Sequence, residues 1–194
     1  MRYLQLGEIA DIQLGKMLSP KAKTGKEPFP YLRNQNVQWD RFDLRDVAAM
    51  DFSERDRERF ALRAGDLLIC EGGEPGRCAV WEEQIAGCYY QKALHRVRPF
   101  EDVADPYFIA LWIRHQALIG AFEDQNAKST IAHLPLVRLQ KLQVPEVDIV
   151  TQREIVRVTR ERLAQVILAK EAAEKQLAEI QLLPQKILSA AFEM

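Results

Sequence analysis

Residues 151–183, TQREIVRVTRERLAQVILAKEAAEKQLAEIQLL, decide the architecture of this chain. Thr151 and Glu154 have the T-x-x-E spacing of a capping box, in which the hydroxyl and the carboxylate each satisfy an unpaired backbone N–H. Apolar residues then recur every seven positions from Val156, and neither Gly nor Pro interrupts the run before Pro184. The pattern predicts one helix that begins at Thr151, ends at Pro184 and is roughly 48 Å long at 1.5 Å per residue.

The apolar residues of this helix form an a/d heptad seam that is broken mainly by Lys170. A seam of this length needs a cover, and a two-fold homodimer through the helix is the arrangement we expect. Packing of the seam along the chain's own domain is the alternative. The residues expected at the dimer interface are Val156, Leu163, Val166, Ala169, Ala173, Leu177 and Ile180.

Composition places the remaining residues in one ordinary globular domain. The chain has 194 residues, of which 47% are hydrophobic and 28% charged, and it contains no apolar run of 18 or more and no signal-like N-terminus. We therefore expect a cytoplasmic protein with no membrane partner. Its globular domain should span residues 1–147, and the helical arm residues 148–194.

Strand and helix signals are mixed within the globular part, which predicts an α+β fold with a small β-sheet and helices, followed by a long C-terminal coiled-coil helix. The segments expected are a strand and a helical turn in 4–14, a strand leading to a polar loop in 29–39, a short helix in 51–60, a hairpin in 66–81, further β structure in 85–99 and a helix in 105–122. In the last helix Asp105 should be the N-cap, with Pro106 at the first position. Its apolar face should comprise Tyr107, Phe108, Leu111, Trp112, Leu118, Ile119 and Phe122.

No pattern of catalytic or metal-binding residues stands out. Cys70, Cys78 and Cys88 are odd in number and lack C-x-x-C spacing, so we expect buried free thiols rather than a zinc site. The Gly-rich segment at 72–76 is not followed by the G-K-[ST] of a phosphate-binding loop. The sequence therefore predicts a chain that catalyses nothing and holds neither a cofactor nor a metal.

Nucleic-acid binding receives mixed support from charge. The net charge of −1 argues weakly against it, but lysines crowd into the segment around residues 16–26, and amide side chains gather at 34–38. Asn and Gln suit the adenine edge, and Arg suits guanine. The candidates for phosphate contacts are Lys16, Lys23, Lys26, Lys92 and Lys128, and those for base edges are Arg33, Asn34, Gln35, Asn36 and Gln91. A solvated loop and an Asn-rich turn that satisfies its own backbone are the alternatives.

Five segments of the chain resemble, in the same order, one repeat of the specificity (S) subunits of type I restriction-modification systems. They are LGEIADIQLGKMLSP at 6–20, YLRNQNVQWDRFDL at 31–44, LRAGDLLICEGGEPG at 62–76, the stretch 131–146 leading to TQREIV at 151–156, and LPQKILSAAF at 183–192. Such subunits carry a target recognition domain followed by a long conserved-region helix, normally twice in tandem with the two helices antiparallel. This chain has one copy of each, which resembles a half-subunit that must dimerise.

The resemblance implies the following expectations. The chain would be a DNA specificity subunit that dimerises to recognise a bipartite, palindromic site in double-stranded DNA. It would recruit methyltransferase (M) subunits and, through them, restriction (R) subunits. The alternative function is a non-catalytic coiled-coil scaffold protein that does not bind DNA.

Overall fold

The computed structural model describes residues 2–18, 24–122 and 133–192, and it confirms the α+β fold with a long C-terminal helix. The chain divides into two compact units, residues 1–153 and residues 154–194. The second unit consists of the continuation of helix α5. The elements are β1 (Tyr3–Gln5), α1 (Leu6–Ile9), β2 (Ala10–Leu14), β3 (Pro28–Leu32), the 3-10 helix η2 (Asn34–Asn36), β4 (Val37–Gln38), β5 (Arg41–Phe42), β6 (Ala48–Asp51), α2 (Glu54–Phe60), β7 (Leu67–Cys70), β8 (Cys78–Val80), β9 (Tyr89–Tyr90), β10 (Leu94–Pro99), α3 (Pro106–Leu118), α4 (Leu136–Gln140), β11 (Gln143–Pro145) and α5 (Ile149–Phe192).

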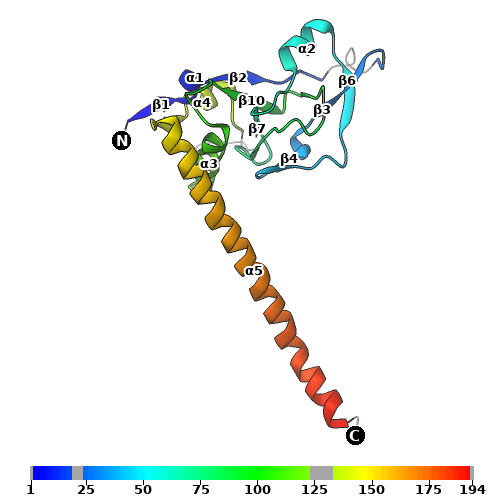
Figure 1. Cartoon of the computed structure of the whole chain (residues 1–194). Coiled ribbons are helices and arrows are strands. Elements are labelled where there is room, and N and C mark those ends of the chain that lie inside the picture. The colour runs from blue at the N-terminus through cyan, green and yellow to red at the C-terminus, as the bar shows by residue number, and fades with distance from the viewer. Residues whose placement is uncertain (1, 19–23, 123–132, 193–194) are drawn as a thin grey trace, which may run out of the picture. The chain divides into compact units, whose positions relative to one another are not determined.

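Short sheets build the first unit. Among the described residues, one sheet has the order β2-β10-β7-β8, with every pair antiparallel. A second has the order β6-β3-β9, in which β3 runs antiparallel to β6 and parallel to β9. The pairs β1-β11 and β4-β5 are two-stranded. Figure 1 shows β1, α1, α3 and α4 at one side of this unit and β3, β4 and β6 at the other.

The core lies between these sheets and is rich in aromatic side chains. Strand β7 is buried at all four positions, so its sequence, LLIC, is continuously apolar. Trp81 and Tyr90 are the largest fully buried side chains, and Phe52 stacks on Tyr89 with ring centroids 4.3 Å apart. The hairpin predicted in 66–81 is confirmed, because β7 and β8 pair antiparallel across the Gly-rich turn.

The three cysteines are free and buried, as the sequence predicts. Burial raises the pKa of the Cys70 thiol to about 11 and that of Cys88 to about 12. None of the helices in the described part of the chain has the length and apolar composition needed to span a membrane.

Helix α3 begins as predicted but buries a different face. The Asp105 carboxylate accepts hydrogen bonds from the backbone N–H groups of Tyr107 and Phe108, which confirms it as the N-cap. The helix buries Phe108, Ile109, Ala110 and Ile113, whereas Leu118 and Ile119, which we expected on the apolar face, are exposed. That expectation was wrong for Leu118 because it lies on the helix side opposite the buried Ile109, and for Ile119 because the helix ends at Leu118.

The start of α5 differs from the predicted capping box. The helix begins at Ile149, and the Asp148 carboxylate accepts hydrogen bonds from the Thr151 backbone N–H at 3.0 Å and from the Thr151 hydroxyl at 2.6 Å. Asp148 is therefore the capping side chain, and these hydrogen bonds hold its pKa below the usual value. Glu154 pairs instead with Arg157, one helical turn further on.

The end of α5 also differs, because the helix continues through Pro184 to Phe192. A proline inside a helix removes one N–H donor and crowds the preceding turn. The residues on both sides of Pro184 are exposed, so water can satisfy the carbonyl that loses its donor. At 1.5 Å per residue the helix is about 66 Å long rather than roughly 48 Å.

The heptad seam of α5 is open over most of its length. Val156 is buried, and the other six residues expected at a dimer interface are exposed in the single chain: Leu163, Val166, Ala169, Ala173, Leu177 and Ile180. Large apolar side chains at helical spacing seldom remain in water, so this face of the helix is suited to a partner.

Candidate nucleic-acid interface

Backbone pairing brings together three segments that carry predicted DNA-binding residues. The Lys16 N–H donates to the Tyr90 carbonyl at 3.1 Å, and the Lys92 N–H donates to the Lys16 carbonyl at 2.9 Å. The Gln91 N–H donates to the Leu32 carbonyl at 3.1 Å, directly beside Arg33. Segments 15–16, 32–36 and 90–92 therefore lie side by side, although they are far apart in the sequence.

Gly15 allows this close approach. A Cβ atom added at Gly15 would lie 2.3 Å from the Gln91 carbonyl oxygen and 2.5 Å from its carbon. Both neighbours are backbone atoms, which cannot move without displacing the segment that carries Gln91 and Lys92.

The substitution Gly15→Ala should therefore destabilise the domain by about 1–3 kcal/mol, the usual cost of forcing an extra carbon into a packed site. Chemical denaturation of the purified protein measures the change. Gly7→Ala is the matched control, since a Cβ there meets its nearest neighbour at an ordinary 3.4 Å. Equal stability of the two variants would contradict the account of Gly15.

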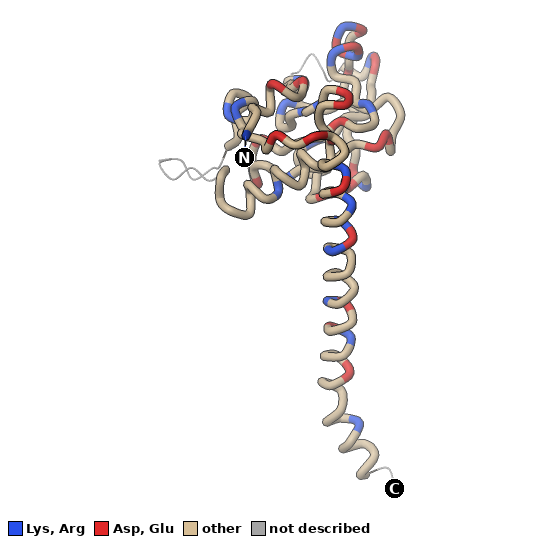
Figure 2. The backbone as a smooth tube through the Cα atoms, turned by 60° about the vertical axis from the view of Figure 1, so that its left-hand side comes forward, with Lys and Arg blue, Asp and Glu red and all other residues tan. Residues whose placement is uncertain are grey.

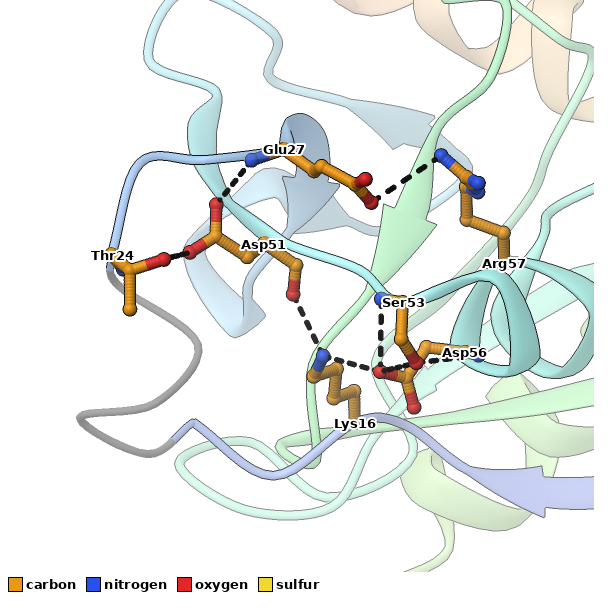
Figure 3. A network of polar contacts seen from close by, with 7 residues as sticks. All are labelled: Lys16, Thr24, Glu27, Asp51, Ser53, Asp56 and Arg57. Carbon is orange, nitrogen blue, oxygen red and sulfur yellow. Dashed lines mark hydrogen bonds and ion pairs between the residues drawn. The ribbon is translucent and has the colours of Figure 1, made fainter.

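Lys16, one of the expected phosphate contacts, points into the domain. Its ammonium donates to the Asp51 carbonyl at 2.7 Å and pairs with the Asp56 carboxylate at 2.7 Å, and its side chain is only 15% exposed (Figure 3). These partners are 35 and 40 residues away in the sequence, so no local sequence pattern predicts these contacts. The geometry gives Lys16 a structural role, in which it ties β6 and α2 to the segment that carries Gly15.

The same network orders the chain before β3. The Asp51 carboxylate accepts hydrogen bonds from Thr24 and from the N–H of Glu27 (Figure 3). It also accepts from the backbone N–H groups of Thr24 and Gly25. The Thr24 hydroxyl and the Glu27 N–H hold the pKa of Asp51 below its usual value. Lys26 lies in this anchored turn and is exposed, so it is available to a phosphate.

In the amide cluster, two of the expected base-reading residues are engaged in internal hydrogen bonds. Asn36 is 1% exposed; its amide donates to the carbonyls of Asp43 and Asp46 and accepts from the Arg33 N–H. Asn34 donates to the Gly72 carbonyl at 2.7 Å and accepts from Arg77 at 2.7 Å. Both amides hold the turn, which is the alternative that the sequence left open.

Gln35 and Arg33 remain at the surface of that turn. Gln35 is exposed and donates to the Asp46 carboxylate at 3.0 Å, and Arg33 pairs with the same carboxylate at 2.8 Å. Asp46 is itself largely exposed, and exposed pairs of this kind contribute little stability in water. Gln35 can therefore exchange Asp46 for another hydrogen-bonding partner, whereas the Arg33 side chain is 25% exposed and also donates to the Asp46 carbonyl at 2.9 Å. Gln91 is half-buried and Lys92 exposed on the neighbouring segment.

A chain of contacts leads from this turn to α3 through residues that the sequence did not suggest. Arg77, which holds Asn34, also pairs with Glu74 at 3.1 Å, and Glu74 accepts a hydrogen bond from the Trp39 indole at 2.6 Å. The Arg114 guanidinium lies over the Trp39 ring, 5.7 Å from its centroid. Gly73, Glu74 and Pro75 then line one side of a cavity of about 480 Å³. The Gly-rich turn was the only local signal for this arrangement.

Charges of both signs are interspersed over this surface, and Figure 2 shows blue and red positions mixed over the domain. Asp43, Asp46 and Glu74 lie among the basic residues. Lys23 and Lys128, also expected at phosphates, lie outside the described residues. In the described ranges, no group of three or more His, Cys, Asp or Glu side chains is placed to hold a metal ion.

The fold of this chain is similar to the folds of several solved structures. A chain from a structure of complex assembly and conformational transition in the type I R-M system is 22% identical, with a TM-score of 0.70; the match covers 98% of this chain and 45% of that one. The HsdS subunit from Thermoanaerobacter tengcongensis is 22% identical with a TM-score of 0.69, over 98% of this chain and 44% of that subunit. The type I restriction-modification S subunit from M. genitalium is 16% identical with a TM-score of 0.54, over 86% and 40%.

This chain therefore spans less than half the length of the solved chains that it matches. Among curated protein sequences, none matches it. The protein-family model described as the type I restriction modification DNA specificity domain matches residues 1–181 of the sequence, which include the globular domain and most of α5. The chain belongs to the family of type I restriction modification DNA specificity domains.

Proposed function

We propose that this chain acts as a DNA specificity subunit of a type I restriction-modification system and dimerises to read a bipartite, palindromic site. The observation that carries the proposal is the family match over both the globular domain and α5. In this proposal residues 1–147 are the target recognition domain, and residues 148–194 are the dimerisation arm and spacer. The chain catalyses nothing and works in the cytoplasm, where methyltransferase subunits and, through them, restriction subunits supply the chemistry.

The reading surface is the cluster of segments 15–16, 32–36 and 90–92. Gln35 and Gln91 offer an amide to a base edge, and Arg33 offers a guanidinium. Lys26 and Lys92 supply phosphate contacts, and Lys23 and Lys128 belong to the same proposal. Asn34, Asn36 and Lys16 act indirectly by holding the turns in place.

Near-neutral charge fits a reader that does not work alone. Nonspecific affinity for DNA rises with the number of phosphates that Lys and Arg neutralise. A surface with interspersed acids neutralises few phosphates per domain, so tight binding needs two domains on one duplex and the additional contacts of the methyltransferase. This requirement favours a dimer within a larger complex.

The seam of α5 suits an antiparallel pair in one register. If Leu163 packs against Ile180 of the second copy, then Val166 meets Leu177. Val156, also expected at the interface, is already buried in the single chain and is left out of this pairing. Each large apolar seam residue from Leu163 to Ile180 then faces another, and the two-fold axis lies between Glu171 and Ala172. Lys170 would meet Ala173, whose small side chain leaves room for the ammonium to extend outward.

Two alanines lie near the two-fold axis of this pair. Ala169 flanks the seam in this register, whereas Ala173 lies in it. Both are small, which permits close approach of the two backbones near the axis.

Selection from random DNA tests the proposed function. The purified chain is mixed with the methyltransferase subunit of its own system, and bound duplexes are sequenced. A specificity subunit should enrich an inverted repeat interrupted by unread bases, because protein symmetry is matched by the symmetry of the target. A scaffold protein that does not touch DNA should enrich no sequence, and that outcome would contradict the proposal.

Two single substitutions should separate base reading from phosphate contact. Gln35→Ala should cost about 1–3 kcal/mol on the selected site and relax the preference at one base position, because a lost base contact affects discrimination. Lys92→Ala should weaken binding to all sequences alike and reduce the dependence on salt. Fluorescence anisotropy on matched and mismatched duplexes measures both effects. Identical behaviour of the two variants would show that the assigned roles are wrong.

A further inference from the structure

A groove of about 640 Å³ opens on the side of the domain that carries β1, α3 and α4, away from β3 and β4 (Figure 1). Its lining includes Tyr3, Trp112, His115, Ile119, Arg138 and Lys141. None of the lining residues belongs to the proposed reading surface. The groove is therefore separate from the surface proposed to read DNA.

One wall of the groove is a row of aromatic rings. Trp112 stacks on His115 with centroids 5.3 Å apart, and Tyr3 lies 6.3 Å from Trp112 at a tilt of 44°. The Trp112 indole donates to the Gln143 carbonyl at 2.7 Å, which fixes the ring against β11. The hydrogen bond and the stacked imidazole hold the Trp112 ring in place, and a ring that is already held loses less entropy when a partner binds.

Large apolar side chains around the groove are exposed to water. Ile119 in the lining is 62% exposed, Tyr3 is 44% exposed, and Val137 on the neighbouring α4 is 60% exposed. Together with the aromatic row they form a concave apolar surface. Such surfaces on a soluble domain commonly mark sites of protein interaction.

The Lys and Arg residues in the described lining of the groove are Lys141 and Arg138. Lys141 is exposed, and Arg138 donates to the Ala121 carbonyl at 2.8 Å. Among the described residues of the lining there is no Asp and no Glu. A complementary partner would present apolar side chains flanked by carboxylates, since opposite charges at the rim steer association.

We propose that this groove docks an amphipathic, acidic segment of the methyltransferase subunit. The inference rests on the proposed function, which requires that subunit as a partner, and adds the surface that receives it. Apolar side chains of the segment would cover Ile119 and Val137 and pack against the aromatic row. Its carboxylates would pair with Lys141 and Arg138.

The exposed aliphatic residues favour a protein over a DNA backbone. A phosphate backbone needs cations and gains nothing from covering Ile119 and Val137. The two occupants respond differently to substitution: a protein segment depends on the apolar floor and the cations, whereas DNA depends on the cations alone.

Calorimetric titration of the full chain with the methyltransferase subunit tests this proposal. Ile119→Asp should lower the affinity for the methyltransferase by about tenfold or more, as expected for an apolar residue in the centre of an interface. Leu118→Asp is the matched control: it changes a neighbouring exposed residue that lines the cavity beside Trp39 instead. Circular dichroism and light scattering should show that both variants keep the fold and the oligomeric state of the wild type.

Lys141→Glu supplies the charge test. It should weaken the same association at low salt, and the difference from wild type should shrink as salt rises. Equal affinity of the wild type, Ile119→Asp and Lys141→Glu for the methyltransferase would overturn this inference and leave the proposed function standing. So would a loss of DNA binding by Lys141→Glu with unchanged methyltransferase affinity, since that result would assign the groove to DNA. A wild-type chain that does not bind the methyltransferase at all would overturn both.

Discussion

The double substitution of Leu163→Glu and Val166→Glu should convert the proposed dimer into a monomer and abolish site-specific methylation. Both residues are exposed on α5 in the single chain and lie in the heptad seam. In the antiparallel register they face Ile180 and Leu177 of the second copy. The substitution therefore places four carboxylates in the two-fold interface.

The effect should be large because two losses add. Each buried Leu or Val contributes about 1.5–3 kcal/mol relative to exposure. Each unpaired carboxylate in an apolar interface costs several kcal/mol more, unless it is protonated. Two-fold symmetry doubles both terms. The dissociation constant of the dimer should therefore rise more than a thousandfold, a change that needs only about 4 kcal/mol.

Light scattering should then report the mass of one chain, 22.3 kDa, for the variant and about twice that mass for the wild type. Lys175→Glu is the control, since residue 175 lies on the helix side opposite the seam, and it should remain dimeric. A dimer that survives the double substitution would show that the seam of α5 is not the interface. A wild-type monomer at the same concentration would contradict the proposed assembly directly.

Deletion of the heptad Ala164–Lys170 should change the spacing between the two DNA half-sites without changing the bases that are read. Removing seven residues preserves the a/d register, and Leu163 still meets Ile180 while Ala173 meets Leu177. Each helix becomes shorter by roughly 10 Å at 1.5 Å per residue. In an antiparallel pair the two helices lie side by side between the two domains. The shortening of the two helices therefore does not add, and the domains approach each other by roughly 10 Å in total.

On B-DNA this change corresponds to about three base pairs at 3.4 Å per base pair. Three base pairs also rotate one half-site by nearly a third of a helical turn, which turns its groove away from a rigid domain. The deletion should therefore move the preferred spacer by about three base pairs or abolish specific methylation. Insertion of three heptads into the wild-type helix lengthens each arm by about 31 Å, which is close to one helical turn of DNA, ~34 Å. This variant should methylate sites whose spacer is about nine base pairs longer, because each domain again faces nearly the same side of the duplex.

Sequencing of methylated genomic DNA from cells that express each variant measures both the spacer and the half-site bases. Gln165→Ala, which leaves the length of the helix unchanged, should keep the wild-type spacer. If the deletion variant methylates sites with the original spacer, the helix does not set the distance between the half-sites. An asymmetric target for the wild type would contradict the two-fold arrangement from which this prediction starts.

Patterns that are local in the sequence predicted much of this structure. The heptad repeat from Val156 predicted α5 because helix periodicity is written in the positions of neighbouring apolar residues. Asp105 and Pro106 predicted the start of α3 for a similar reason, since a cap needs only the next few backbone N–H groups. The ends of α5 were less well determined: Asp148 competed with Thr151 as the cap, and an exposed helix tolerated Pro184.

The candidate site shows where local patterns stop being informative. Composition and side-chain chemistry selected Lys16, Asn34 and Asn36 because cations and amides suit nucleic acids. The partners that engage them, Asp56, Gly72 and Asp46, are 40, 38 and 10 residues away, so only the folded chain shows that these groups are already satisfied.

The sequence by itself therefore determined the class of the fold, the long helix with its apolar seam and the segments in which polar residues gather, because these depend on residues close together in the chain. The tertiary structure decided which of those polar side chains face solvent, since each hydrogen bond to a distant carbonyl or carboxylate removes a group from the surface. It also decided that Tyr3, Trp112 and Ile119 line one groove. These residues meet because β1, at the start of the domain, pairs with β11, at its end, and this pairing brings β1 next to α3 and α4.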